Sequence, residues 1–504
     1  MRELGIFTDG TICAPATIPG TGAISIIRVS GEDSLAIADK VIDVKGESLS
    51  ETEGYRLRYG TIFADNGSVL DNVIVSVFRA PHSYTGENSV EISCHASRFI
   101  VNAVLELLVN AGARIAAPGE FTRRAFVNGK MDLAQAEAVA DVIASQSAAA
   151  HRVAMNQLKG GFSSELKTLR EKLLTMTSLL ELELDFSEED VEFASRSELG
   201  ALVEETLAHI VRLTDSFSRG NAIKNGVPVA IVGATNTGKS TLLNALLGEE
   251  RAIVSDIAGT TRDTIEETLN LGGVVFRFID TAGIRETDEV VEKIGIERTF
   301  RKLNEASIVL GMTDLSLGED TVLSDAEYIW DKVNASSSDR EFVLLVNKCD
   351  VNGIESVAAG FAETGSEGGF AGTGSEAGCA GKAGKMARIE AALREKGIVT
   401  KMIPISAKTG SGLPELTETL AEIGRRITGD TDETLVTNIR HYEALSRAAT
   451  ALGRVRDGLK VATLPPDLIA QDLREALYHL GEIVGEISTD EVLGNIFRKF
   501  CIGK

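Results

Sequence analysis

The sequence has 504 residues, of which 43% are hydrophobic, so the chain can form two to four domains with buried cores. Its formal net charge of −23 opposes sequence-independent binding to nucleic acid, so a nucleic-acid partner would require a local basic patch or a second protein. The five cysteines are scattered and odd in number, which argues against a disulfide framework or a cysteine-based zinc site. No apolar run is long enough to span a bilayer, and the first residues lack the apolar core of a signal peptide, so we expect a cytoplasmic protein without a membrane anchor.

Residues 1–128 alternate short β-like runs with turns, which predicts an α+β domain. Four runs are rich in Val, Ile, Tyr and Phe and are bounded by Gly, Asp or Asn: AISIIRVSG, YRLRYGTIF, DNVIVSVFRA and NSVEISCHAS. A helix closed by Gly112 is predicted in FIVNAVLELLVNAGA.

Residues 129–225 lose the strand pattern and become rich in Ala and Leu at helical spacing. The same pattern returns in 429–504, where apolar residues recur every three or four positions: Leu445, Ala448, Leu452, Val455 and Leu459. Between them, residues 226–428 alternate strands and helices as in a parallel α/β sheet. The sequence therefore predicts a multidomain fold in which an inserted α/β domain interrupts one all-α helical domain.

Residues 352–385 are rich in Gly, Ala and Ser and contain few aliphatic side chains. Such a segment buries too little apolar surface to offset its ordering entropy, so we expect a disordered surface insertion.

The strongest motif is a phosphate-binding loop in VPVAIVGATNTGKSTLLNALLG, with a β run before it and a helix after it. The glycines let backbone N–H groups turn toward the β-phosphate, and the helix N-terminus adds positive potential. Lys239 would reach the β- and γ-phosphates, and the Ser240 hydroxyl would bind Mg²⁺. The alternative is a chance match in a glycine-rich turn, which the strand and the helix on either side argue against.

Three further motifs, each after a β run, favour GTP over ATP. FRFIDTAGI places Asp280 to hold Mg²⁺ through water and Gly283 to meet the γ-phosphate. In VLLVNKCD, Asp350 can accept both N–H groups of the guanine edge, which adenine does not offer, while Asn347 meets the base and the Lys348 stem covers the ring. The IPISAKTG backbone could contact guanine O6 through Ser406, Ala407 and Lys408.

SDIAGTTRD, which lies between the phosphate loop and FRFIDTAGI, contributes Thr261 as the second protein ligand of Mg²⁺, in a segment that orders when the γ-phosphate is present. An ordinary polar loop is the alternative. The predicted GTP-binding residues are Asn236, Thr237, Gly238, Lys239, Ser240, Thr241, Ser255, Asp256, Ile257, Ala258, Gly259, Thr260, Thr261, Asp280, Thr281, Ala282, Gly283, Asn347, Lys348, Asp350, Ser406, Ala407 and Lys408.

Ile284 stands where many small GTPases carry the Gln that orients the attacking water, and the sequence shows no identifiable arginine finger. The following RETDEVVEKIGIER offers several glutamates for this role, and spacing alone does not choose among them or exclude a solvated helix face: Glu286, Glu289, Glu292 and Glu297.

Several stretches outside the general GTPase motifs complete the pattern: TIPGTGAISIIRVSG, TGENSVEISCH, APGEFTRRAFVNGKMDLAQAEAVADVI and FRKFCIGK. Together with DTAGIRETDEVVEKIGIER, they make the chain resemble, nearly end to end, the MnmE (TrmE) family of tRNA-modification GTPases within the TrmE-Era-EngA-like group.

This resemblance implies a tetrahydrofolate-binding and dimerisation domain (1–128), a helical domain (129–225 and 429–504) and a Ras-like G domain (226–428). It implies K⁺-stimulated GTP hydrolysis when two G domains meet, in a homodimer that forms a heterotetramer with an MnmG-type FAD protein. The pair would add a carboxymethylaminomethyl or aminomethyl group to C5 of the wobble uridine of certain tRNAs. The one-carbon unit would come from a tetrahydrofolate derivative, the 5,10-methylene or 5-formyl form, and glycine or ammonium would supply the amine.

The resemblance also implies roles for particular residues. Glu292 would orient the attacking water, and Lys239 would assist catalysis. K⁺ would replace the arginine finger at ligands that fall on Asn236, Ser255, Ile257 and Thr260. The folate site would comprise Arg28, Glu87, Lys130 and Lys504, and each of these is by itself an ordinary surface charge.

FRKFCIGK has three interpretations. A lipid-anchor box does not fit, because such a box normally ends in Ser, Met, Gln, Ala, Leu or Phe rather than Lys. Cys501 could be a functional thiol of the family or a cysteine that only packs.

Two departures from the family pattern are the long 352–385 insertion and Ser255, where Thr is frequent. The competing functions are a GTPase of ribosome assembly and a folate-dependent aminomethyl-transfer enzyme that carries a G domain. The N-terminal folate motifs and CIGK argue against the first of these, because assembly GTPases lack both.

Overall fold

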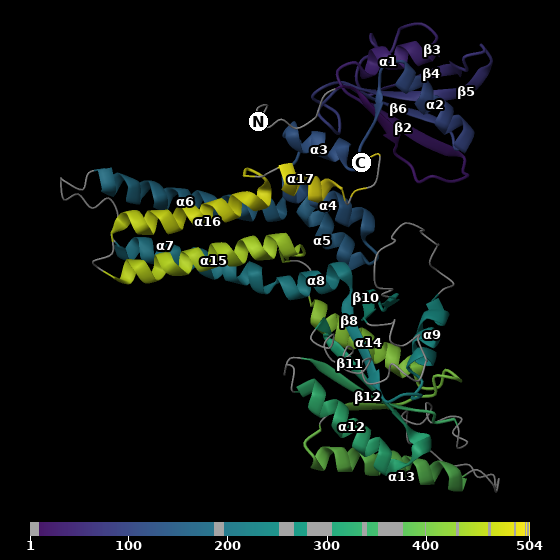
Figure 1. The fold of residues 1–504 in the computed structure, drawn as a ribbon, viewed down its shortest axis with the longest axis vertical. Coiled ribbons are helices and arrows are strands. Elements are labelled where there is room, and N and C mark those ends of the chain that lie inside the picture. The colour runs from purple at the N-terminus through teal and green to yellow at the C-terminus, as the bar shows by residue number, and fades with distance from the viewer. Residues whose placement is uncertain are drawn as a thin grey trace, which may run out of the picture. The chain divides into compact units, whose positions relative to one another are not determined.

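The structure is a computed structural model that describes residues 10–185, 196–250, 267–279, 305–334, 340–350, 376–398, 400–429, 433–461, 465–487, 490–498, 500 and 503. The chain forms two compact units (Figure 1). The first contains Met1–Ala144, Ala154–Asp215 and Ile439–Lys504, and the second contains Ser145–Val153 and Ser216–Asn438. The domain boundaries drawn from the sequence stay a prediction.

The first unit begins with a sheet of seven strands within the described residues, in the order β3-β4-β5-β6-β2-β1-β7. The strands are β1 Ile12–Pro15, β2 Ile24–Ser30, β3 Ile42–Val44, β4 Arg56–Phe63, β5 Val69–Phe78, β6 Ser89–His95 and β7 Arg114–Ile115. All neighbours pair antiparallel except β1 and β7. The four predicted strands are β2, β4, β5 and β6, and the three short strands were not predicted.

The two faces of this sheet differ. Alternate residues of β2, β5 and β6 form a core with α1 (Ser34–Val41) and α2 (Arg98–Asn110), the predicted helix, which ends just before Gly112. On the other face, Leu57 and Tyr59 of β4 and Ile74 of β5 are 68%, 63% and 48% exposed. Within the described residues, this second face therefore carries exposed apolar side chains on β4 and β5.

The helices of the first unit come from both ends of the sequence. They are α3 Glu120–Val127, α4 Leu133–Ala144, α6 Gly161–Asp185, α7 Arg196–Asp215, α15 Ile439–Lys460, α16 Pro466–Val484 and α17 Asp490–Phe497. Helix α15 packs on α7 and α16, and α16 packs on α6 (Figure 1). The predicted apolar positions Leu445, Ala448 and Leu452 are fully buried there. This arrangement confirms that one helical domain is built from two separate parts of the chain.

The second unit contains a sheet of six strands among the described residues, in the order β13-β12-β11-β8-β10-β9. The strands are β8 Val227–Gly233, β9 Glu267–Leu271, β10 Val274–Ile279, β11 Ile308–Asp314, β12 Glu341–Asn347 and β13 Lys401–Pro404. All neighbours are parallel except β9 and β10, as expected for an α/β domain with an antiparallel edge strand.

Helices cover both faces of this sheet. They are α9 Lys239–Glu250, α12 Glu319–Asn334, α13 Glu376–Glu395 and α14 Leu413–Thr428. One core joins the sheet to α9 and α14, and the other joins it to α12 and α13. The predicted fold class, α+β, all-α and inserted α/β, is thereby confirmed.

One prediction differs from the structure, and one stretch is divided in a way that the sequence analysis did not specify. Residues 131–158, which have helical spacing, form two helices, α4 and α5 (Ala148–Leu158), and the Ser147 hydroxyl accepts from the Ala150 N–H at 3.1 Å where the second helix begins. Residues 376–385, expected to be disordered, form the start of α13, while 351–375 lie outside the described residues. Ala and Lys favour helix, and the same helix continues to Ile389 and Leu393, which are buried in the sheet core.

None of the described helices combines the length and the apolar character needed to cross a membrane.

Candidate functional site

The phosphate loop lies between the end of β8 and the start of α9, as predicted. The Thr237 hydroxyl donates to the Ala234 carbonyl at 2.9 Å and is buried. Asn236 adopts a left-handed backbone with φ of 60°, which Asn tolerates better than most residues. Gly238 has φ of 99°, and a Cβ there would lie 2.5 Å from the Asn347 amide nitrogen. The loop therefore requires glycine at position 238.

Lys239 extends back over this loop. Its ammonium donates to the Gly233 carbonyl at 3.0 Å and to the Ala234 carbonyl at 2.8 Å. Burial lowers the pKa of Lys239. A phosphate at the α9 N-terminus would thus be next to a lysine ammonium, backbone N–H groups and the positive end of the helix dipole.

Asn347, the last residue of β12, joins three of the predicted motifs. Its amide nitrogen donates to the Thr237 carbonyl at 2.6 Å, and its amide oxygen accepts from the Ala407 N–H at 3.0 Å. The Ser406 hydroxyl donates to Asp350 at 2.9 Å. The phosphate loop, NKCD and SAK segments therefore meet at the carboxyl ends of β8 and β12, where open α/β sheets bind ligands.

Lys348 is held by Asp314, a residue that the sequence analysis did not identify. The Lys348 ammonium donates to Asp314 at 2.6 Å, and the Lys348 backbone has φ of 62°. Burial opposes ionisation of Asp314, but hydrogen bonds from Lys348 and Ser316 outweigh it and keep the pKa of Asp314 below its usual range. The available signal, which the sequence analysis did not use, was an aspartate at the end of the largely apolar run IVLGMTD, which forms β11.

Several predicted GTPase residues lie outside the described residues: Ser255 to Thr261, Asp280 to Gly283, and Glu292. Ser240 and Thr241 lie on the first turn of α9, and Lys408 follows Ala407. The Mg²⁺, K⁺ and water-orienting roles therefore stay predictions.

The second predicted site surrounds Arg28, which lies on β2. Its guanidinium pairs with Glu91 across the β2–β6 register, with N–O distances of 2.9 and 2.8 Å. The guanidinium carbon lies 5.2 Å from the Tyr84 ring centre and 5.6 Å from that of Phe121. Arg28 is thus held by one carboxylate and two aromatic rings.

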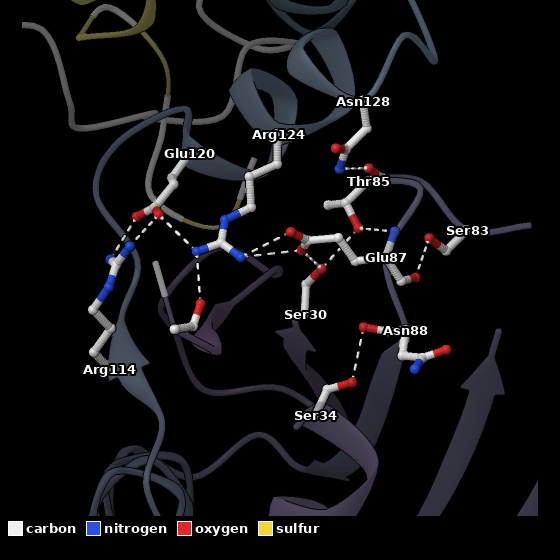
Figure 2. Close-up of polar contacts among 11 residues, drawn as sticks. Ser30, Ser34, Ser83, Thr85, Glu87, Asn88, Arg114, Glu120, Arg124 and Asn128 are labelled. Carbon is white, nitrogen blue, oxygen red and sulfur yellow. Dashed lines mark hydrogen bonds and ion pairs between the residues drawn. The ribbon is translucent and has the colours of Figure 1, made fainter. Parts of the chain in front are cut away.

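Glu87 lies in the turn before β6 and is tied to a buried arginine (Figure 2). Arg124 of α3 donates to both Glu87 oxygens at 3.0 and 3.1 Å, and the Ser30 hydroxyl donates to one of them at 2.7 Å. Arg124 and Glu91 were not predicted. The signal for Arg124 was its position three residues after Phe121 in GEFTRRAF, which puts both on one helical face. The signal for Glu91 was a charged residue directly after NSV, inside the predicted β run NSVEISCHAS.

Lys130 is exposed and donates from its ammonium to the Pro81 carbonyl at 3.0 Å. Pro81 belongs to the same β5–β6 connection as Glu87, and Asn128 also donates to this connection, at the Thr85 carbonyl, at 2.7 Å. Arg28, Glu87 and Lys130 therefore lie around one turn of the first unit.

The segment after α17 also reaches this part of the first unit. A Cβ on Gly503, which has φ of 98°, would lie 2.0 Å from the Pro15 carbonyl oxygen at the end of β1. Cys501 and Lys504 lie outside the described residues.

Comparison with known proteins identifies the family. Residues 11–130 match the family described as GTP-binding protein TrmE N-terminus, and residues 133–501 match the family described as MnmE helical domain. A Parabacteroides distasonis protein named tRNA modification GTPase MnmE is 50% identical over 497 residues, which cover 98% of this chain and 100% of that protein. Proteins with the same name from Bacteroides fragilis and Porphyromonas gingivalis are 51% identical over 501 residues (98% of this chain, 99% of that protein) and 46% identical over 508 residues (100% of both). The resemblance predicted from the motifs is thus confirmed, and the chain belongs to the MnmE family of tRNA modification GTPases.

Proposed function

We propose that this chain hydrolyses GTP in the cytoplasm and, with an MnmG-type FAD protein, modifies C5 of the wobble uridine in certain tRNAs. The added group is carboxymethylaminomethyl or aminomethyl, and its one-carbon unit comes from a methylene-tetrahydrofolate. The observation that supports this proposal most directly is that Asn347 bonds to both Thr237 and Ala407, so that the phosphate loop, NKCD and SAK segments meet. The same chain also carries the cluster of Arg28, Glu87 and Lys130.

In the GTP site, the main task of the chain is to position the nucleotide and neutralise its charge. Lys239 and the α9 N-terminus hold the phosphates, and Asp350, fixed by Ser406, accepts the N–H groups of guanine. Ser240, which lies on the first turn of α9, would hold Mg²⁺ together with Thr261 in this proposal. Bound Mg²⁺ would neutralise charge on the transferred phosphoryl group. Glu292 orients the attacking water in this proposal.

The folate site uses the charges around the β5–β6 turn. A pterin ring offers a guanine-like row of N–H donors, which suits the Glu87 carboxylate. The cations Arg28 and Lys130, with Lys504, suit the glutamate tail of a tetrahydrofolate. This assignment explains why charged side chains gather on this turn.

The exposed sheet face supports the assembly that the proposal requires. Leu57, Tyr59 and Ile74 form an apolar surface that a second copy of this domain can cover, giving a homodimer. The net charge of −23 makes a basic surface on the MnmG-type partner, in a heterotetramer, the route by which tRNA is bound.

The proposal is tested by nucleoside analysis of tRNA from cells that lack this protein. We expect the modified wobble uridine to disappear and to return with the wild-type chain but not with Lys239→Ala, which lacks the phosphate-loop ammonium. Asp331→Asn, at an exposed position on α12, serves as the control. An unchanged nucleoside profile would instead favour a GTPase of ribosome assembly.

GTP hydrolysis should be roughly tenfold or more faster in K⁺ than in Na⁺ at equal ionic strength, because a fitted cation beside the phosphates replaces the missing arginine finger. Asn236, exposed at the top of the phosphate loop, offers an amide oxygen to that cation, so Asn236→Ala should remove the difference. The exposed Asn225→Ala on α8 (Phe217–Asn225) should retain it. Equal rates of phosphate release in K⁺ and Na⁺ would refute the proposed K⁺ site.

A further inference from the structure

A buried arginine stands behind Glu87. Arg124 is only 1% exposed, yet its guanidinium carries a full charge. Besides its two bonds to Glu87, it donates to the Gly10 carbonyl at 2.8 Å and to Glu120 at 3.2 Å. A buried charge of this kind persists only when it is paired and hydrogen-bonded.

Four charged side chains form a row of alternating sign: Arg114, Glu120, Arg124 and Glu87 (Figure 2). Arg114 binds Glu120 through two N–H groups at 2.8 and 2.5 Å. Burial opposes ionisation of Glu120, but Arg114, the Ala117 N–H and Arg124 outweigh it and lower the pKa of Glu120. Arg124 contacts Glu120 through one guanidinium nitrogen, which leaves the other terminal nitrogen for Glu87.

This arrangement fixes the direction of the Glu87 carboxylate. One Arg124 nitrogen spans both oxygens, and Ser30 donates to Oε2. A carboxylate has about four acceptor positions, so Oε1 in particular keeps acceptor capacity. The Glu87 side chain is 21% exposed, whereas Arg124 is covered. The unused acceptor capacity therefore lies on Glu87, the side chain that a ligand can reach, and not on the covered Arg124.

We propose that Arg124 is a positioning residue of the folate site. It does not touch the ligand, but it orients the Glu87 side chain to accept adjacent N–H donors of a heterocycle. This inference rests on the proposed function, since it assumes that Glu87 faces the pterin. Arginine is suited to the task, because one guanidinium nitrogen contacts both Glu87 oxygens while the second, held in the same plane, reaches Gly10 and Glu120. A lysine ammonium has a single nitrogen and cannot hold both sets of partners in this fixed geometry.

The test is calorimetric titration of the full-length protein with 5-formyl-tetrahydrofolate. Arg124→Lys keeps the charge but loses the fork, and we expect roughly tenfold or more weaker binding; Arg124→Met should weaken binding further. Glu87→Gln should also weaken it. If Arg124 acts through Glu87, the double variant Arg124→Met/Glu87→Gln should bind no more weakly than the poorer single variant.

Arg56→Lys serves as the control, because it makes the same change of arginine to lysine in the same domain. The Arg56 side chain lies on β4 and is 67% exposed. Thermal melting of each variant shows whether it folds. If Arg124→Met does not fold, the binding of Arg124→Lys decides the test. The inference is overturned if Arg124→Lys binds as the wild type does, or if the losses from Arg124→Met and Glu87→Gln add fully. In both cases the proposed function stands as long as the wild-type chain binds. A wild-type chain that does not bind 5-formyl-tetrahydrofolate would instead defeat the folate function itself.

Discussion

Asp350→Asn should change the preferred base from guanine to xanthine, with a loss of GTP affinity of about 100-fold or more. In the proposed site, the wild-type carboxylate accepts two N–H groups from guanine, and the Ser406 hydroxyl, which donates to it at 2.9 Å, fixes its orientation. An asparagine offers one acceptor and one donor, so it opposes the guanine amino group and matches the xanthine carbonyl. The measurement compares dissociation constants of fluorescent GTP and XTP analogues in the wild type and the variant.

The matched control makes the same change, aspartate to asparagine, at a position outside the proposed guanine site. Asp331→Asn alters an exposed aspartate of α12 in the same unit, and both nucleotide affinities should stay as in the wild type. Unchanged GTP affinity in Asp350→Asn would refute the assignment of Asp350 to the guanine edge.

Local sequence was sufficient for the phosphate loop because each of its features has a local cause. The β run, the glycines and the helix that follows all lie within one short stretch, and the structure forms β8, the loop and α9 there. The role of Asn347 as a junction was not predictable in this way. Its partners, Thr237 and Ala407, are distant in sequence and become neighbours only through the parallel order of β8, β11 and β12.

The N-terminal cluster was predicted only through family resemblance, since each of its charges alone is typical of any protein surface. The Arg28–Glu91 pair depends on the register of β2 against β6, and a shift by one residue would place Glu91 on the other face. Arg124 was missed for a related reason: sequence patterns assign arginines to the surface, and only the packing of α3 shows that this one is buried. The prediction for the start of α13 was wrong because the Gly, Ala and Ser content of this segment does not show that the helix continues into residues whose apolar side chains, Ile389 and Leu393, are buried.

A second buried charge cluster lies in the helical bundle, between α4 and α15. Glu137 accepts from Arg440 at 3.1 and 2.8 Å and contacts the His441 ring nitrogen at 2.7 Å. Arg440 also donates to the carbonyls of Glu482 and Ile483. The cluster therefore joins α4 and the start of α15 to the end of α16, three helices that enter the bundle from different parts of the sequence.

The charge on Glu137 should make this bundle sensitive to acid. Burial opposes ionisation, but His441 and Arg440 outweigh it and lower the pKa of Glu137 from 4.5 to about 2. Because the folded-state pKa is depressed, the stabilisation is present above pH 4.5 and is lost as the pH falls from 4.5 toward 2. At neutral pH it corresponds to roughly 3 kcal/mol, and Glu137→Gln should lose an amount of this order because it leaves Arg440 without its counter-charge.

Hydrogen exchange of the α15 amides at neutral pH and under mild acid measures this loss within the bundle. Glu137→Gln should speed exchange at neutral pH and flatten its acid dependence, whereas Glu205→Gln, which removes only the exposed pair with Lys172, should change little. Trp330, the single tryptophan of the chain, lies on α12 of the second unit, so its fluorescence reports separately on the α/β unit. Faster α15 exchange with an unchanged Trp330 transition would place the effect in the bundle. Equal α15 exchange in Glu137→Gln and the wild type would show that the cluster contributes no net stability, as some buried ion pairs do not.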